Sequence, residues 1–128
     1  MPKNLVEVIA LTSATKLGND YELHQHQRLS VRLGLGRDWV TAVERLDGAD
    51  AEGLGDHERV IQCFVLAVLE RTGKDTVAEL DAVIDAVGYR QAIAALMVIG
   101  RYATHALIVN CLNLEPPVPS IYEDGFEG

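Results

Sequence analysis

The sequence predicts an all-α fold, a compact bundle of about six helices. Three observations lead to this prediction. Apolar side chains recur every three or four residues along most of the chain, the spacing that places them on one face of a helix. The 128 residues are 48% hydrophobic but only 5% aromatic, and this composition of small aliphatic side chains suits closely packed helices. Three of the four prolines stand in the last thirteen residues, which leaves the preceding chain free to form helices.

The first two predicted helices are joined by a very short turn. Residues 4–17 carry apolar side chains at helical spacing, and Gly18 is a suitable stop. Asn19 or Asp20 can cap the next helix, which extends to the glycine break at 34–36. Because the connection is so short, we expect the two helices to lie side by side and roughly antiparallel.

Two more helices and a loop follow. Residues 37–46 are expected to form a short helix, and the Gly- and Asp-rich residues 47–55 an exposed loop. Asp56 is the expected cap of a fourth helix that carries a stripe of core side chains. The stripe comprises Ile61, Phe64, Val65, Val68 and Leu69.

The fifth helix is expected to be capped by Asp75 and to end at Gly88. The sixth spans residues 89–112 and is apolar around much of its circumference, so we expect it to be buried centrally or in a subunit interface. We assign residues 1–114 to a single helical domain. Residues 115–128 are expected to form an extended acidic tail, because its prolines cannot continue a helix.

Composition and charge exclude several classes of protein. The formal net charge of −8 argues against binding to nucleic acid. Glu7 interrupts the first apolar stretch, so no secretory signal forms, and the longest apolar run, 92–100, is far shorter than the roughly 20 residues of a membrane span. Cys63 and Cys111 lie in apolar helical patterns and are expected to be buried free thiols. We therefore expect a soluble cytoplasmic protein with no nucleic-acid or membrane partner.

The second predicted helix contains the constellation best suited to chemistry. Glu22 and His26 are one helical turn apart on the same face. Glu7, on the antiparallel first helix, can face the same cleft. Two carboxylates and an imidazole are the groups of general acid–base catalysis, because a neighbouring charge can bring a pKa toward neutrality. The alternative is a solvated surface pair worth about 0.2–0.5 kcal/mol.

Several motifs, taken together, resemble one superfamily. They are Glu7, the Tyr21-Glu22-x-x-x-His26 pattern, Gly34, Trp39, Val43, the helix start at 54–59 and the segment 99–110 that leads into Leu114-Glu-Pro-Pro. This set, which spans most of the chain, is similar to the carboxymuconolactone decarboxylase and alkylhydroperoxidase D superfamily. The resemblance implies a helical scaffold of the alkylhydroperoxidase D type. It also implies self-association into a trimer, a hexamer or another closed oligomer, for which the apolar sixth helix gives a physical reason.

The cysteines of one branch of that superfamily are absent. In the alkylhydroperoxidase D branch, a C-x-x-C-x-x-x-H motif follows a glutamate on the preceding helix. On this chain the glutamate falls at Glu7, the two cysteines at Asn19 and Glu22, and the histidine at His26. Without a thiolate pair there is no disulfide to cycle, so thiol peroxidase activity is not expected.

The decarboxylase branch has a histidine at this place without cysteines. The resemblance therefore implies lyase- or isomerase-type chemistry on a small organic acid, with His26, Glu22 and Glu7 as catalytic residues. No cofactor and no metal are expected, since no set of three ligands with metal-binding spacing occurs. Arginines are the candidate clamps for the substrate carboxylate. The candidate substrate-binding residues are Tyr21, Arg28, Arg101, Tyr102 and His105, with Arg32 as a further candidate clamp.

Two alternatives remain open at this point. Tyr102 and His105 lie three residues apart on the sixth helix, where they can equally be hydrogen-bonded core or interface groups. The whole chain can also be a non-catalytic helical oligomer or a small-molecule-binding module on the same scaffold. A buried pocket around His26 would favour the enzyme, and a solvated pair of Glu22 and His26 would favour the module.

Overall fold

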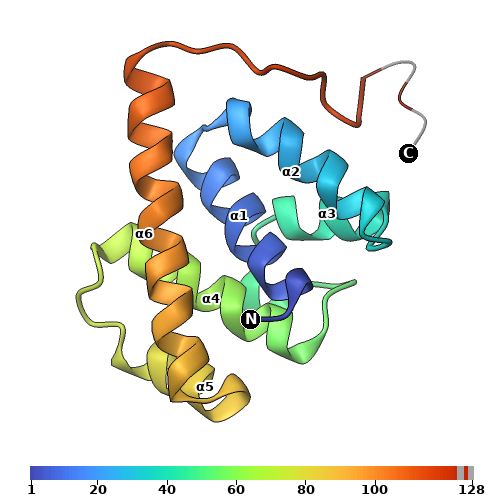
Figure 1. Ribbon diagram of the computed structural model, residues 1–128. Coiled ribbons are helices and arrows are strands. Elements are labelled where there is room, and N and C mark those ends of the chain that lie inside the picture. The colour runs from blue at the N-terminus through green and yellow to red at the C-terminus, as the bar shows by residue number, and fades with distance from the viewer. Residues whose placement is uncertain (124–125, 127–128) are drawn as a thin grey trace.

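The computed structural model describes residues 1–123 and 126, and within these residues all regular secondary structure is helical (Figure 1). The helices are α1 (Lys3–Leu17), α2 (Asp20–Arg32), α3 (Arg37–Glu44), the 3-10 helix η1 (Gly48–Asp50), α4 (Asp56–Arg71), α5 (Val77–Val87) and α6 (Tyr89–Cys111). The prediction of a compact all-α fold with about six helices is therefore confirmed.

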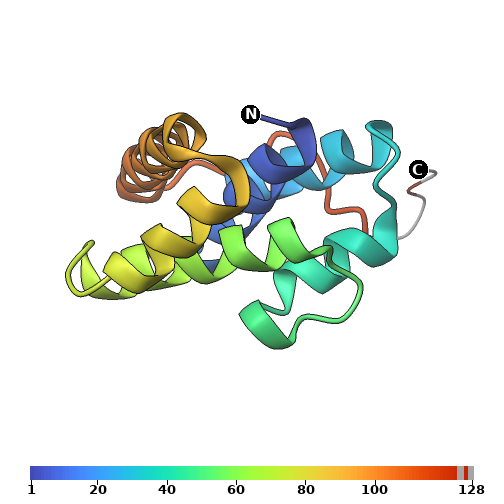
Figure 2. The same ribbon diagram turned by 90° about the horizontal axis from the view of Figure 1, so that it is seen from below.

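Helix α1 is the centre of the bundle. It packs against α2, α3, α4 and α6, and Figure 2 shows it enclosed between them. Its residues 7–14 are all buried, including the polar Thr12 and Ser13. A helix that is buried on every side is typical of a central core position. The central position matters for the site below, because it brings a glutamate of α1 into the interior.

The turn between α1 and α2 follows the sequence expectation. Gly18 has a φ of 66°, the left-handed conformation that ends many helices and that glycine adopts without strain. Asn19 caps α2, because its side-chain oxygen accepts a hydrogen bond from the backbone N–H of Glu22 at 3.1 Å. The chain thereby reverses direction within two residues, and α2 packs beside α1.

Two predicted helix caps are wrong. Gly55 rather than Asp56 precedes α4, and its N–H donates to Glu58 Oε1 at 2.7 Å. Thr76 rather than Asp75 precedes α5. Asp75 has a φ of 55°, a conformation that aspartate tolerates better than most residues, so it forms part of the turn before the helix instead of capping it.

The sequence predicts that the loop 47–55 is exposed, but the structure shows that part of it is buried. Gln62 of α4 is fully buried, and its side-chain oxygen accepts a hydrogen bond from Gly48 N at 3.0 Å. Its amide nitrogen donates to Val43 O at 2.7 Å and to Thr12 Oγ1 at 3.1 Å. Every hydrogen-bonding group of this buried amide is satisfied, so it fixes the loop against α1, α3 and α4.

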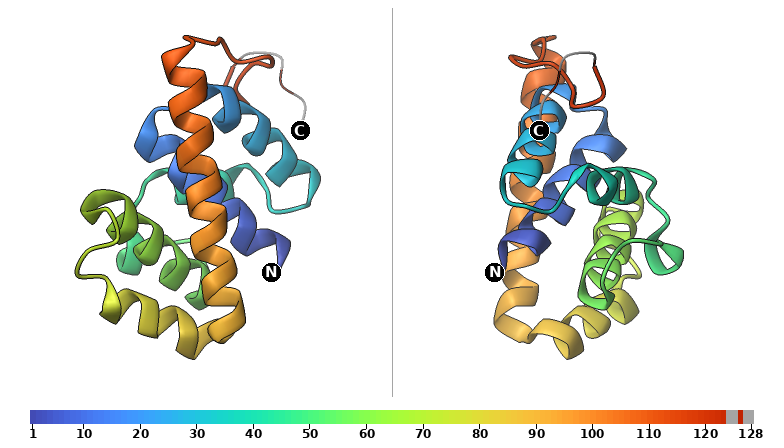
Figure 3. Two further views of the ribbon diagram at one scale, coloured as in Figure 1. Left: turned by 60° about the vertical axis from the view of Figure 1, so that its left-hand side comes forward. Right: turned by 90° about the vertical axis from the view of Figure 1, so that its right-hand side faces the viewer.

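Helix α6 packs one face on α1 and α5 and leaves its other face uncovered (Figure 3, left). In this single chain α6 is therefore not buried centrally on all sides, and burial of its uncovered face in a subunit interface, the other alternative, stays a prediction. The buried residues are Ala92, Ala95, Ile99, Ala106 and Val109, whereas large apolar side chains such as Met97 and Leu107 are exposed. Over its 23 residues α6 is also long and apolar enough to cross a membrane, which the run 92–100 alone did not suggest. Length and apolar composition are weak evidence for a membrane span, since the core helix of a soluble protein meets the same criteria.

Neither cysteine is the buried thiol expected from the sequence. Cys63 of α4 is half-buried, and Cys111 at the end of α6 is exposed. The reason is that an apolar helical pattern identifies a helix but not the angle at which it is rotated toward the core.

The tail returns across α2 after α6 ends. Ile121 is fully buried, and Gln27 Oε1 accepts hydrogen bonds from Ser120 Oγ at 2.9 Å and from Ile121 N at 3.2 Å. His24 Nδ1 lies 3.0 Å from Val118 O. Residues 124, 125, 127 and 128, which include two of the acidic residues of the predicted tail, lie outside the described residues.

Candidate acid–base site

One histidine is held between two carboxylates. His26 Nδ1 lies 2.8 Å from Glu7 Oε1, and His26 Nε2 lies 2.9 Å from Glu22 Oε2. The exposed fractions of these side chains are 13% for His26, 4% for Glu7 and 18% for Glu22. Each ring nitrogen faces an oxygen that can only accept, so both nitrogens must carry hydrogen for both bonds to form. The geometry therefore suits the imidazolium cation.

The pKa of His26 is raised above its ordinary value. Burial alone lowers it, because the charged ring loses contact with water. The hydrogen bond and charge of Glu7, followed by the charge and hydrogen bond of Glu22, outweigh that effect and favour the protonated ring. Both carboxylates thus favour the protonated form of His26, and each faces one of its two ring nitrogens.

The two carboxylates come from different helices. Glu22 and His26 are one turn apart on α2, so local helix geometry alone brings them together. Glu7 belongs to α1 and is almost fully buried, and it also accepts a hydrogen bond from Ser30 Oγ at 3.3 Å. Its contact with His26 depends on the tight turn at Gly18, which packs α2 along α1.

Helix α6 adds two further groups to the cluster. The hydroxyl of Tyr102 lies 3.4 Å from His26 Nε2, and the two rings meet edge to face with centroids 5.4 Å apart. His105 Nε2 lies 3.2 Å from Glu22 Oε1. The two residues whose placement the sequence left open therefore both face the cluster.

The hydrogen bonds of Asn19 indicate which ring nitrogen of His105 carries hydrogen. Asn19 Oδ1 accepts from the N–H of Glu22, which leaves its amide nitrogen 3.3 Å from His105 Nδ1. That nitrogen can only donate, so His105 Nδ1 must accept. The ring is then neutral with its hydrogen on Nε2, and this hydrogen is donated to Glu22. A continuous network results, from Glu7 through His26, Glu22 and His105 to Asn19.

Tyr102 is a hydrogen-bonding group rather than a base. Burial, reinforced by the charges of Glu7 and Glu22, raises the pKa of Tyr102 to about 12. Its phenol therefore keeps its hydrogen across the ordinary pH range. This hydroxyl lies beside His26 Nε2, so it can also contact a molecule that accepts a proton from this nitrogen.

The other predicted substrate-binding residues lie at different distances from the cluster. The ring of Tyr21 is 5.9 Å from that of His105. Arg101 is exposed, with its guanidinium carbon 6.0 Å from the Tyr102 ring. Arg28 is turned to the tail, where its Nε donates to Pro119 O at 3.0 Å. Arg32, the further candidate, is exposed at the end of α2.

Sequence reasoning missed two members of the network, Asn19 and Ser30. Asn19 was identified as a helix cap, but its second hydrogen bond depends on the packing of α6. Ser30 carried a usable signal, since it follows His26 by four residues as His26 follows Glu22. The helical series 22, 26, 30 therefore extends the face that meets Glu7.

The cluster is not arranged as a metal site, and it does not line any of three pockets found elsewhere on the molecule. Among the described residues, no group of three or more His, Cys, Asp and Glu side chains is arranged to hold a metal ion. The donors and acceptors instead face one another in pairs. Three pockets of about 440–500 Å³ lie elsewhere, between α4 and α5, beside Trp39 on α3, and between His24 and the tail. Solvent reaches the cluster at His105, whose side chain is 35% exposed.

Comparison with known proteins gives no match. No family model, no curated protein and no solved structure matches this chain. The function is therefore inferred from the geometry of the cluster, in which an imidazole is held between two carboxylates and bordered by a phenol and a second imidazole.

Proposed function

We propose that the chain is a carboxymuconolactone decarboxylase-like protein that performs acid–base chemistry, of the lyase or isomerase type, on a small organic acid in the cytoplasm. The observation that supports this proposal is the bracketing of His26 by Glu7 and Glu22 at 2.8 and 2.9 Å, together with the raised pKa of the ring. Buried groups with a perturbed pKa and a specific charged partner are enriched at catalytic sites.

His26 is the proposed proton donor. Loss of carbon dioxide from an organic acid leaves an electron pair on carbon, and a proton must be delivered to that carbon to complete the reaction. A shift of a double bond requires a similar delivery. The raised pKa and the two facing carboxylates favour the protonated form of His26. Glu22 keeps a second donor in His105, so it stays hydrogen-bonded when His26 turns toward a substrate.

The carboxylate of the substrate requires a cation. Arg101 is the best placed of the three candidate clamps, since it lies beside Tyr102 and is exposed, whereas the Nε of Arg28 is bonded to the tail and Arg32 lies at the far end of α2. Tyr21, Tyr102 and His105 would border the bound acid. A thiol peroxidase reaction is not proposed, because Asn19 and Glu22 occupy the positions of the cysteine pair in the resemblance.

The test is a proton-exchange assay. The protein is incubated in deuterated water with a panel of small unsaturated carboxylic and lactone acids, and deuterium incorporation at carbon and loss of the carboxyl group are followed by NMR. Exchange at carbon reports the proton transfer even when no net turnover occurs. His26→Gln is expected to lower the exchange rate by about 10²–10⁴-fold, the contribution of a positioned acid or base.

The control for this test is His57→Gln, which changes an exposed histidine in the first turn of α4. It should leave the exchange rate unchanged. Absence of exchange with every acid, or equal rates for the wild type and His26→Gln, would mean that the cluster is a buried ion-pair network with a structural role.

A second candidate function is a non-catalytic helical oligomer or small-molecule-binding module, and the outer face of α6 favours it. Six exposed residues follow one another at alternating intervals of four and three, the repeat of a helix that packs on another helix. They are Ile93, Met97, Gly100, Thr104, Leu107 and Cys111, and we call them the α6 stripe. Self-association into a trimer, a hexamer or another closed oligomer is compatible with both candidates.

A further inference from the structure

The middle of the α6 stripe contains a glycine that the fold of one chain does not require. Gly100 is the central residue of the 23-residue helix α6, and it is exposed. Glycine is the least favourable residue in the interior of a helix apart from proline. An alanine at this position would make the helix more stable, so the glycine needs another reason.

The other glycines of the described residues have such a reason. Seven of them have a positive φ, which a residue with a side chain rarely adopts. At an eighth, Gly55, a Cβ would lie 3.4 Å from Glu58 Oε1. Gly100 has neither constraint, since a Cβ there would meet no other part of the described chain within 4 Å. The missing side chain therefore leaves room for something outside the chain.

Larger apolar side chains lie on both sides of Gly100 along the α6 stripe. Ile93 stands seven residues before it and Leu107 seven residues after it, with Met97 between Ile93 and Gly100. The stripe is thus low at its middle, at Gly100 and Thr104, and higher toward both ends. A small residue where two helices cross lets the backbones approach closely, and larger side chains then pack on each side of the crossing. This shape fits a second helix.

The charge of α6 favours another copy of this chain as the owner of that helix. The formal net charge is −8, so two copies repel one another. Helix α6 contains no aspartate and no glutamate, and its two arginines are Arg90 and Arg101. Two copies that meet at α6 therefore bring none of the carboxylates of this helix together.

The exposed apolar surface of α6 is of the size that such a contact needs. Five large side chains of the helix are between 38% and 72% exposed, namely Tyr89, Ile93, Met97, Leu107 and Ile108. Together they present several hundred Å² of surface, on the order of the ~800 Å² that each partner buries in a standard interface. A lipid surface would also cover these side chains, but it would gain nothing from a glycine among them.

We propose that two copies of the chain pair through their α6 stripes and that the two helices cross at Gly100. In a two-fold pair the residue at the crossing meets its own counterpart, so the low part of one stripe lies on the low part of the other. This inference rests on the self-association proposed above and specifies its contact. It is independent of the acid–base chemistry at His26, which the exchange assay tests separately.

The test is the dissociation constant of the pair, measured by light scattering over a dilution series. Gly100→Ala adds one methyl group at the crossing and should raise the dissociation constant by about tenfold or more, as overpacking does in a core. Gly100→Leu should abolish the pair. At a dilution where the chains are single, the midpoint of thermal unfolding of Gly100→Ala should not fall, because alanine is the better helix former. A weaker pair of an equally stable chain assigns the effect to the contact.

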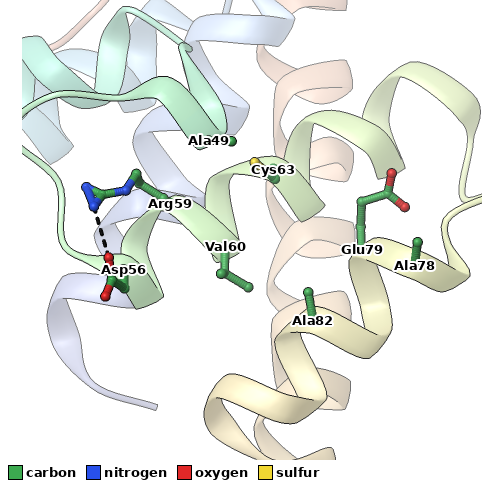
Figure 4. A pocket seen from close by; sticks show the side chains of 8 residues that line it. All are labelled: Ala49, Asp56, Arg59, Val60, Cys63, Ala78, Glu79 and Ala82. Carbon is green, nitrogen blue, oxygen red and sulfur yellow. Dashed lines mark hydrogen bonds and ion pairs between the residues drawn. The ribbon is translucent and has the colours of Figure 1, made fainter.

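The control is Ala78→Leu, which adds a side chain at an exposed residue of α5, in the wall of the pocket between α4 and α5 (Figure 4). It should leave the dissociation constant unchanged.

Two results would overturn only the crossing at Gly100. They are a wild-type mass of three chains, and a wild-type oligomer that Gly100→Leu leaves intact, which would place the self-association on another surface. A wild-type mass of one chain at every concentration would overturn the self-association as well. If that single chain sedimented with vesicles of phosphatidylcholine and phosphatidylglycerol, a lipid surface would be the occupant of the stripe.

Discussion

At the scale of single residues, the surroundings of His26 are formed by partners at different distances from it along the chain. Glu22 is four residues away, and the sequence predicts that contact because an α-helix brings such residues together. Glu7 is 19 residues away, so its 2.8 Å contact requires the correct packing of two helices. Tyr102 is 76 residues away, and no local pattern fixes the rotation of α6 that turns it toward His26.

The stability of the protein should depend on pH through His26. The pKa of the ring is raised in the folded state, so the folded protein binds the proton more tightly than the unfolded chain. The resulting stabilisation is fully present below the unfolded-state pKa, near 6.5, and is lost as the pH rises through the higher folded-state pKa. Urea unfolding between pH 5.5 and 9, in roughly half-unit steps, should show the wild type losing its advantage over His26→Gln toward high pH.

The exposed His57 supplies the comparison for that series. His57→Gln should give the same pH dependence of the free energy of unfolding as the wild type. A difference between wild type and His26→Gln that stays constant with pH would contradict the raised pKa.

The two carboxylates should differ in their influence on His26. Burial is the largest effect on this pKa and lowers it, and Glu7 provides the largest opposing effects, ahead of Glu22. Glu7→Gln should therefore lower the pKa of His26 more than Glu22→Gln does. It should also destabilise the fold by about 1–3 kcal/mol, because an almost fully buried acceptor is replaced. Titration of the His26 ring hydrogens by NMR gives the pKa, and an equal effect of the two variants would be contrary to this expectation.

At the scale of helices, the apolar spacing predicts which segments are helical but not how each is turned. The predicted bounds of α1, α2 and α6 agree with the structure to within one or two residues. The caps at Asp56 and Asp75 were wrong, since aspartate also suits the first turn of a helix, where Asp56 lies, and the turn before it, where Asp75 lies. Which face of α6 lies uncovered could not be predicted, because a helix that is apolar around much of its circumference does not reveal which side faces the core.

Asn19 has two roles, since its side chain caps α2 and contacts His105 of the acid–base cluster. Two substitutions separate these roles. Asn19→Ala removes the cap and should destabilise the protein by about 1 kcal/mol. Asn19→Asp keeps the cap, since aspartate is an equally good N-cap, but it puts an accepting oxygen against His105 Nδ1.

In Asn19→Asp, Nδ1 of His105 should therefore acquire a hydrogen, which the ¹⁵N chemical shifts of the ring report directly. Unchanged shifts would show that the amide of Asn19 does not define the tautomer. Asn4→Asp, at an asparagine that donates to Glu58 Oε2 away from the cluster, is the matched control.

At the scale of the whole molecule, one surface is unlike the rest. The α6 stripe presents apolar and small side chains along most of a 23-residue helix, and its members Met97 and Leu107 are 72% and 68% exposed. Contiguous exposed apolar surfaces can mark sites of association. The α6 stripe is therefore the surface on which we expect the proposed self-association, and the number of subunits depends on how the stripes of several chains meet.

A charge placed on the stripe should separate the subunits. Light scattering of the wild type is expected to give a mass above the 14.0 kDa of one chain, and Met97→Glu or Leu107→Glu should return it to that value, because a carboxylate cannot be buried between apolar helices without a partner. Val77→Glu introduces the same charge at an exposed apolar residue of α5 and should leave the mass unchanged. A wild-type mass of one chain would contradict the prediction.

The bonds between Gln27 and the tail also set an order of events in folding. They join residues separated by 93 and 94 positions, so closing this contact requires most of the chain to be in place. During synthesis, Glu7, Glu22 and His26 leave the ribosome well before Ser120 and Ile121. The buried side chain of Gln27 therefore lacks these two donors in the nascent chain, and only water can supply them until residues 120 and 121 have been added.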